Sequence, residues 1–401
     1  MAAILSWQLF GASLVLSSQG AERFRGRTLD KKLLFVTGTR ADFGKLEPLA
    51  IASRAAGYQV SFFVTGMHMM ARYGMTKLEV HRVEGVSVHE FMNQRDDDPQ
   101  DTVLAKTMMG FSDFVAELRP DLVVVHGDRV EALACALVCA TNYIRCAHIE
   151  GGEVSGTIDE LFRHCNSKLA YCHFVSSEDA ARRIRALGED AASIYVIGSP
   201  ELDFHAGPSG VTLQEVRDRY AITFADFGIV SFHPVTSEAG DMGRQAKALY
   251  AGLAASGRSF VVILPNNDPG ARDILDVVKD LDPAQFRVIP SMRFAHFSEL
   301  MRHAACIVGN SSMGVREAPF LGVPSLDVGT RQTKRGVSGT ITTCMADDAD
   351  AIASFLETEW GKKYASHRGF GEGHAAGRFV EVLEQPDFWT RPMQKTFHDA
   401  D

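Results

Sequence analysis

From Lys32 onward, the chain alternates short apolar runs with longer amphipathic stretches. The apolar runs have the length and the β-branched content of buried strands. In the first half they span residues 33–37, 59–65, 122–126, 144–149, 173–176 and 194–197, and in the second half residues 229–232, 260–264, 286–289, 306–308 and 325–328. Helical stretches separate them, so the pattern predicts two successive series of parallel βα units. We therefore expect an α/β protein in which two Rossmann-like domains face a shared cleft.

The domain boundaries follow from the same pattern. Residues 201–210 end in Gly-Pro-Ser-Gly and are the best candidate for the link between domains. We expect one domain over residues 32–205, a second over 206–385 and a tail over 386–401. Residues 1–31 form an extension with an apolar first half, but it lacks the basic start of a secretory signal and is too short to span a bilayer. We expect disorder or an early start codon there, and an anchor or targeting helix is the alternative.

Composition narrows the class of protein. The 401 residues are 46% hydrophobic, which is enough for two cores, and the net charge of -9 argues against nucleic acid as the main partner. The seven cysteines include no Cys-x-x-Cys pair. Cys135 and Cys139 lie one turn apart in an apolar helical stretch, which is typical of packing. A protein of the reducing cytoplasm is the simplest expectation.

Two predicted strands near the centre of the chain are each followed directly by several charged residues. The run Val-Val-Val-His-Gly-Asp-Arg ends at Arg129, and the run His-Ile-Glu-Gly-Gly-Glu-Val-Ser-Gly-Thr-Ile-Asp-Glu ends at Glu160. A predicted helix over residues 130–142 connects them, so both strands end at the same edge of the sheet. Carboxylates gathered at one edge are costly unless chemistry or a cation uses them. The carboxylates concerned are Asp128, Glu150, Glu153 and Asp159.

Other strand ends carry groups that suit a diphosphate. Thr37-Gly-Thr-Arg40 opens the first helix, and Gly309-Asn-Ser-Ser-Met-Gly314 should cap a helix that begins near Ser312. A plain helix cap explains the two serines equally well. Arg331 follows another strand and adds a cation. His233 also follows a strand, although a hydrogen-bonded structural histidine is the alternative there.

A zinc site is a further alternative for the two central strand ends. Its ligands would be His126, Asp128, His148 and Glu150. Their spacing matches no known zinc pattern, so we expect no metal and no other cofactor.

These residues carry a resemblance to a known family, the hydrolysing UDP-N-acetylglucosamine 2-epimerases. That family includes the bacterial sialic-acid enzyme and the epimerase half of the animal bifunctional epimerase/kinase. The similar motifs are His126-Gly-Asp-Arg129, His148-Ile-Glu-Gly-Gly-Glu-Val-Ser-Gly-Thr-Ile-Asp159, Arg163-His164, Gly309-Asn-Ser-Ser-x-Gly-Val-Arg-Glu317 and Gly329-Thr-Arg-Gln332. The resemblance implies a fold similar to the GT-B glycosyltransferases, a UDP-sugar held mainly by the second domain, and a homo-oligomer.

The resemblance also separates subfamilies. Non-hydrolysing relatives typically read Gly-Thr-Arg-Pro-Glu and His-Val-Glu-Ala-Gly-Leu-Arg at two of these places. Here the first place reads Gly38-Thr-Arg-Ala-Asp-Phe-Gly-Lys45 and the second reads His148-Ile-Glu-Gly-Gly-Glu153. Both differences favour the hydrolysing type.

Residue roles are likewise implied by the family. The implied catalytic residues are Asp128, Glu150, Asp159, Arg163 and His233. The implied contacts to the nucleotide or the sugar are Arg40, Asp42, Lys45, Arg129, Gly152, Asn266, Ser311, Ser312, Glu317 and Arg331.

Several reactions remain open at this stage. The family's reaction would release UDP from UDP-N-acetylglucosamine by elimination to a glycal, and water would then give free N-acetylmannosamine. The same reaction on UDP-2,4-diacetamido-2,4,6-trideoxyglucose is the alternative within the family. A GT-B glycosyltransferase and a non-catalytic sugar-nucleotide sensor are more distant alternatives.

Overall fold

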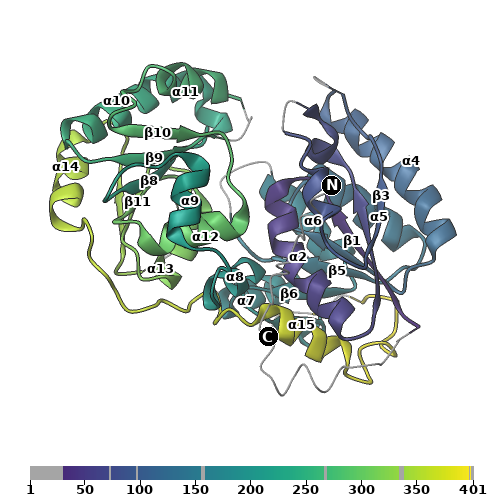
Figure 1. Cartoon of the computed structure of the whole chain (residues 1–401). Coiled ribbons are helices and arrows are strands. Elements are labelled where there is room, and N and C mark those ends of the chain that lie inside the picture. The colour runs from purple at the N-terminus through teal and green to yellow at the C-terminus, as the bar shows by residue number, and fades with distance from the viewer. Residues whose placement is uncertain are drawn as a thin grey trace, which may run out of the picture.

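The computed structural model describes residues 30–71, 74–95, 98–154, 159–265, 269–333, 338–396 and 398. Residues 1–29 of the predicted extension and Asn266 lie outside these ranges. The described chain forms two parallel β-sheets, each surrounded by helices, which Figure 1 shows as two lobes. In this part of the chain, no helix is long and apolar enough to cross a membrane.

Within the described residues, the first sheet has seven parallel strands in the order β3-β2-β1-β4-β5-β6-β7. Its strands are β1 (Lys32–Thr37), β2 (Gln59–Val64), β3 (Ser87–Glu90), β4 (Leu122–His126), β5 (Cys146–Ile149), β6 (Cys172–Val175) and β7 (Ile194–Val196). The helices of this segment are α2 (Arg40–Ala55), η1 (Gly66–Met69), α3 (Lys77–Val80), α4 (Gln100–Leu118), α5 (Val130–Thr141), α6 (Asp159–Leu169), α7 (Glu178–Ala186) and η3 (Ala191–Ser193).

The second sheet also pairs all its described strands in parallel, in the order β10-β9-β8-β11-β12-β13. Its strands are β8 (Gly228–Ser231), β9 (Phe260–Ile263), β10 (Phe286–Ile289), β11 (Ile307–Gly309), β12 (Ser325–Val328) and β13 (Ile341–Cys344). The remaining helices are η4 (Pro200–Leu202), α8 (Asp203–Ala206), α9 (Leu213–Tyr220), η5 (Thr236–Asp241), α10 (Met242–Ala255), α11 (Ala271–Val278), α12 (Phe294–His303), η6 (Ser312–Gly314), α13 (Glu317–Phe320), α14 (Ala349–Thr358) and α15 (Ala375–Leu383).

Both sheets share one topology, which confirms the predicted pair of Rossmann-like units. In each sheet the chain builds outward from the first strand to one edge, then returns and builds toward the other edge. The direction therefore reverses between β1 and β4 in the first sheet and between β8 and β11 in the second. Ligands of open α/β sheets bind at the carboxyl ends of the strands beside such a reversal.

The structure corrects two details of the prediction. β3 and β13, which lie at the sheet edges, were not expected, because their residues are mostly exposed or half-buried and carry no continuous apolar run. The α-helix expected near Ser312 is a three-residue 3₁₀ turn, and the short helix α13 begins only at Glu317. Arg316 thus lies in the bend between η6 and α13.

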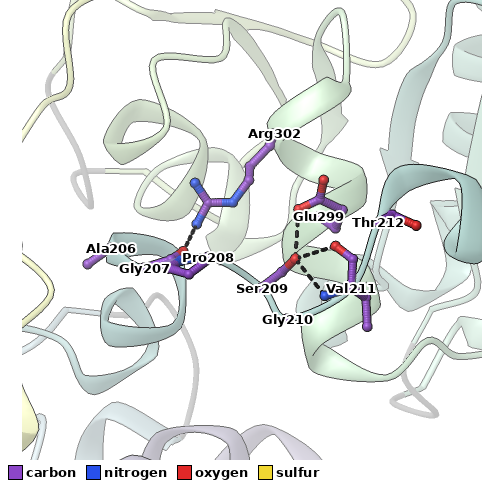
Figure 2. Close-up of a pocket in the computed structure, with 9 residues that line it drawn as sticks. All are labelled: Ala206, Gly207, Pro208, Ser209, Gly210, Val211, Thr212, Glu299 and Arg302. Atoms are coloured by element: carbon purple, nitrogen blue, oxygen red, sulfur yellow. Dashed lines mark hydrogen bonds between the residues drawn. The ribbon is translucent and has the colours of Figure 1, made fainter. Parts of the chain in front are cut away.

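The segment that links the two sheets is hydrogen-bonded to helix α12. The predicted segment 201–210 begins within η4, continues through α8 and then becomes irregular. The Ser209 hydroxyl donates to Glu299 (2.7 Å), and Arg302 Nη2 donates to the carbonyl oxygen of Gly207 (2.6 Å). These four residues are among those that line a pocket of about 530 Å³. Figure 2 shows the lining residues and the hydrogen bonds between them. The pocket lining includes none of the residues implied to be catalytic or substrate-binding.

Helix α15 returns to the first sheet, although the predicted second domain included it. Phe379 is fully buried there, with its ring 4.6 Å from that of Phe174 and 6.4 Å from that of Phe35. Figure 1 shows α15, in yellow, beside α2. The apolar face of α15 therefore completes the core of the first lobe.

We predict that Phe379→Ala destabilises the first lobe by about 3–5 kcal/mol, because it removes a buried ring and leaves a cavity. Urea unfolding would measure the loss. Glu381→Ala, on an exposed position of the same helix, is the matched control and should change the free energy of unfolding by less than about 0.5 kcal/mol. An equal effect of the two substitutions would contradict the packing of α15 in this core.

Candidate active site

Glu150 lies at the centre of a buried ionic site just beyond strand β5. Its backbone has a φ of 59°, a left-handed conformation that costs a residue other than glycine about 1–3 kcal/mol. Lys45 Nζ lies 2.7 Å from Glu150 Oε2, and Arg316 Nη1 lies 3.0 Å from both carboxylate oxygens. The hydroxyl of Ser199 also donates to this carboxylate. The strained backbone thus carries a carboxylate with several partners.

Two further glutamates share the same cations. Arg316 Nη2 lies 2.8 Å from Glu153 Oε2, and its Nη1 lies 3.5 Å from Glu201 Oε1. Lys45 Nζ lies 3.2 Å from Glu201 Oε2. We refer to Lys45, Glu150, Glu153, Glu201 and Arg316 as the Glu150 cluster. Its members come from α2, from the loop after β5, from η4 and from the bend before α13, so the cluster joins the two sheets.

The opposite charges in this cluster stabilise the ionised forms of its side chains. Burial alone would raise the pKa of Glu150, but Arg316 and Lys45 outweigh burial and hold that pKa well below its usual value. Burial likewise opposes the charge of Arg316, yet Glu150 and Glu153 raise its pKa well above the usual range. The pKa of Lys45 is raised in the same way by Glu150 and Glu201. Glu150 is therefore an anion at neutral pH.

His126 connects the cluster to the start of helix α2. Its Nδ1 lies 3.1 Å from Asp42 Oδ1, and its Nε2 lies 3.3 Å from Glu150 Oε2. Burial alone would lower the pKa of His126, but the hydrogen bonds to Asp42 and Glu150 raise it. Helix α2 begins where predicted because the Thr39 side chain caps it by accepting from the amide of Asp42 (3.2 Å). The cap fixes Asp42 opposite the imidazole.

Asp128 has a separate cationic partner. It forms an ion pair with Arg163, which also donates to the carbonyl oxygen of Glu153 (3.0 Å). The Asp128 side chain is 23% exposed, against 6% for that of Glu150, so it is the more accessible carboxylate. His148 does not share these partners. Its Nε2 lies 2.7 Å from the carbonyl oxygen of Gly127, and burial lowers its pKa to about 3. His148 is thus a neutral structural residue.

The strand ends of the second sheet meet at Asn310. Its side-chain oxygen accepts from the amide of His233 (2.6 Å), and its side-chain nitrogen donates to the carbonyl oxygen of His233 (2.8 Å). Arg331 Nη1 and Gln332 Nε2 both donate to the backbone carbonyl of Asn310, at 3.2 and 2.8 Å. The half-buried Ser311 follows directly. The ends of β8, β11 and β12 are thereby locked together.

The other implied residues are placed with different partners. Glu317 is buried, and its Oε1 lies 3.7 Å from His205 Nε2. Burial and the nearby Glu201 raise the pKa of Glu317. Arg129 Nε lies 3.7 Å from Glu131 Oε2. Gly152 lies against α7, where an added Cβ would come within 2.3 Å of the Ala180 carbonyl oxygen, so packing already requires glycine. Half-buried Arg40 opens α2, while Asn266 and the Asp159 side chain lie outside the described part.

Sequence reasoning missed part of the cluster. Arg316 stands inside a motif that carries the resemblance, one residue before Glu317, but no role was implied for it. Ser199 and Glu201 follow strand β7 in the way that the other candidates follow their strands. Their position just after a strand was the available signal, but Glu201 was read as the start of a linker and Ser199 was given no role.

Comparison with known proteins settles the family. The family model described as UDP-N-acetylglucosamine 2-epimerase matches residues 51–384. The chain belongs to this family. A UDP-N-acetylglucosamine 2-epimerase of Neisseria meningitidis serogroup B is 40% identical over 373 residues, which cover 92% of this chain and 99% of that protein. The resemblance recognised in the motifs is confirmed, and the chain is an enzyme of the UDP-N-acetylglucosamine 2-epimerase family.

Other similar proteins extend the comparison. The UDP-N,N'-diacetylbacillosamine 2-epimerase (hydrolyzing) of Legionella pneumophila is 29% identical, over 88% of this chain and 96% of its own length. The crystal structure of a Neisseria meningitidis UDP-GlcNAc 2-epimerase bound to UDP-GlcNAc has a TM-score of 0.77 at 20% identity, and covers 88% of this chain and 99% of its own. The structural similarity supports the two-lobed fold of this epimerase family member.

We predict that Asp42→Asn lowers the pKa of His126 by about 1 unit or more, because it removes a hydrogen-bonded anion. NMR titration of labelled histidine, with the signal assigned from His126→Gln, would measure it. The exposed Asp101→Asn is the control and should leave the signal unchanged. A His126 pKa that is equal in wild type and Asp42→Asn would contradict the contact.

The same contact sets a pH dependence of stability. The folded-state pKa of His126 is above its ordinary value of 6.5. The protonated imidazole therefore contributes its full stabilisation of the folded state below about pH 6.5. The contribution is lost as the pH rises through the folded-state pKa. Stability should therefore fall less over this window in Asp42→Asn than in wild type.

Proposed function

We propose that this epimerase is of the hydrolysing type and converts UDP-N-acetylglucosamine into free N-acetylmannosamine and UDP. The observation that carries the proposal is the pairing of Glu153 with Arg316 beside Glu150. In the non-hydrolysing pattern His-Val-Glu-Ala-Gly-Leu-Arg, a leucine stands at the position of Glu153, so that carboxylate would be missing. The similarity to a Legionella pneumophila enzyme named as hydrolyzing supports the same assignment.

The reaction must overcome the low acidity of the C2 proton. No carbonyl group lies next to C2 in the sugar ring. Departure of UDP from C1 solves this problem, because the developing oxocarbenium ion acidifies the C2 proton. Loss of that proton gives a glycal, and water then adds at C1 while C2 is protonated from the other face. Such a reaction needs groups that transfer protons and cations that stabilise the leaving diphosphate.

The candidate residues divide between these tasks. The anionic state of Glu150 supports a role as proton acceptor or as a charge partner of the oxocarbenium ion, and not as proton donor. Asp128 and Asp159 are the other proposed proton-transfer groups, with Arg163 orienting Asp128. We assign the diphosphate to cations and to the second sheet's strand ends. The assigned residues are Arg40, Arg129, His233, Ser311, Ser312 and Arg331.

The second candidate substrate is UDP-2,4-diacetamido-2,4,6-trideoxyglucose. The name of the Legionella pneumophila relative favours it, but that protein is 29% identical to this chain, against 40% for the Neisseria meningitidis relative. We therefore favour UDP-N-acetylglucosamine, and a role for the N-acetylmannosamine product in the synthesis of sialic-type acids. UDP release from the two sugars, measured side by side, distinguishes these substrates.

In heavy water with UDP-N-acetylglucosamine, we predict release of UDP and of free N-acetylmannosamine that carries deuterium at C2. The deuterium arises because elimination removes the original C2 proton and solvent replaces it. NMR and mass spectrometry of the products would measure both features. Accumulation of UDP-N-acetylmannosamine would refute the hydrolysing assignment, and a product without deuterium would refute elimination.

Substitutions should separate binding from chemistry. We predict that Asp128→Asn, Glu150→Gln and Asp159→Asn each lower turnover by about 10²–10⁴-fold, the usual contribution of a proton-transfer group. Each should still bind UDP in calorimetry. Arg331→Ala should instead weaken UDP binding, because it removes a cation from a partly desolvated diphosphate. Carboxylate variants with normal turnover, or with UDP binding as weak as in Arg331→Ala, would overturn this division.

A further inference from the structure

Arg316 brings a positive charge from the second sheet to the carboxylate at the end of β5. It stands four residues after Ser312 and directly before Glu317, within the segment to which we assign diphosphate contacts. Its side chain is 4% exposed. It is separated from Glu150 by 166 positions in the sequence, yet it contacts both oxygens of that carboxylate. Because the two residues belong to different lobes, their contact depends on how the lobes are placed relative to each other.

Both terminal nitrogens of this guanidinium are occupied by carboxylates. Nη1 lies 3.0 Å from each oxygen of Glu150 and 3.5 Å from Glu201, and Nη2 lies 2.8 Å from Glu153. The guanidinium carbon lies 5.1 Å from the ring centroid of Phe370, in the segment that leads back to α15. A guanidinium held in this way has a fixed orientation, and its terminal nitrogens face carboxylates instead of an anionic ligand.

We propose that Arg316 is a positioning residue, which fixes the Glu150 carboxylate in its anionic form and ties it to the nucleotide-binding segment of the opposite lobe. The proposal rests on the proposed function of Glu150 but adds a residue that acts through it. Arg316 itself does not contact the reacting atoms. Its effect is to make the charge and orientation of Glu150 depend on docking of the second sheet.

The neighbours of Glu150 define what a loss of Arg316 would do. Lys45 faces the carboxylate from α2 and His126 faces it from β4, so two positive or protonatable groups would remain. Glu153 and Glu201 would also remain, with fewer cations to balance them. Like charges in a buried site favour proton uptake by one of the carboxyl groups. Glu150 should then become protonated at a higher pH than in wild type.

The test is the pH dependence of kcat for Arg316→Gln. We expect the acid limb of the profile to move upward by about 1–3 pH units, the effect of removing a neighbouring guanidinium from a carboxylate. UDP affinity, measured by calorimetry, should stay as in wild type. Arg316→Lys, which keeps a charge, should restore a lower acid limb. Arg287→Gln is the matched control, because Arg287 lies on β10 and donates to the Tyr220 carbonyl.

The outcomes that overturn the proposal are distinct. A folded Arg316→Gln protein in which neither the acid limb nor the titration midpoint of Glu150 moves would show that Arg316 does not control Glu150. Loss of UDP affinity comparable to that of Arg331→Ala would make Arg316 a diphosphate ligand instead. Should the single variant fail to fold, the double variant Glu153→Gln/Arg316→Gln removes one charge of each sign. It should still show an upward shift, but a smaller one, because the like charge of Glu153 is removed as well.

A readout without turnover separates this proposal from the proposed function. The carboxyl carbon of Glu150, assigned by comparison with Glu150→Gln, can be titrated by NMR in wild type and in Arg316→Gln. A higher midpoint in the variant supports the proposal even if the wild-type protein releases no UDP from UDP-N-acetylglucosamine. Equal midpoints refute it whatever the substrate.

Discussion

The buried pairing of Glu150 with Arg316 and Lys45 is the interaction on which the candidate site depends. A buried carboxylate is costly unless cations and hydrogen bonds compensate for its lost hydration. Removing one partner of a buried ion pair typically costs about 3–5 kcal/mol, because the other charge is left uncompensated. The cations come from α2 and from the bend before α13. The site can therefore form only when both lobes are folded and docked.

The proposed chemistry is divided between the two lobes. The first sheet supplies the acidic strand ends, including Asp128 and Glu150, while the second sheet brings His233, Asn310 and Arg331 together. A UDP-sugar has a matching division, because its diphosphate needs cations and its sugar needs proton-transfer groups. Arg316 stands on the second-sheet side, four residues after Ser312, and forms an ion pair with Glu150 of the first.

Most of the fold could be predicted from the sequence because buried parallel strands are continuous apolar runs. Strands β4, β10 and β12 have the predicted bounds. The edge strands β3 and β13 were missed because each has a neighbour on one side only, and their sequences Ser-Val-His-Glu and Ile-Thr-Thr-Cys are largely polar. The return of α15 was missed as well, since an amphipathic pattern does not indicate which sheet a helix covers.

The candidate site was also predictable only in part, because local sequence patterns do not show which distant segments come into contact. Strand ends reveal which side chains reach one edge of a sheet, and this placed Glu150 and His233 correctly after their strands. The pairing of Arg316 with Glu150 joins different lobes and has no local sequence signal. Glu201 was read as linker because a glycine- and proline-rich stretch follows it, and Gly152 was implied near the sugar although packing against α7 already requires it.

The most direct test of this account is a crystal structure with both proposed products, UDP and N-acetylmannosamine, bound. The account predicts that Glu150 remains paired with Lys45 and Arg316, that its carboxylate lies beside C2 of the sugar, and that the diphosphate lies against Ser311, Ser312 and Arg331. A diphosphate bound to Arg316, or a sugar remote from Glu150, would contradict it.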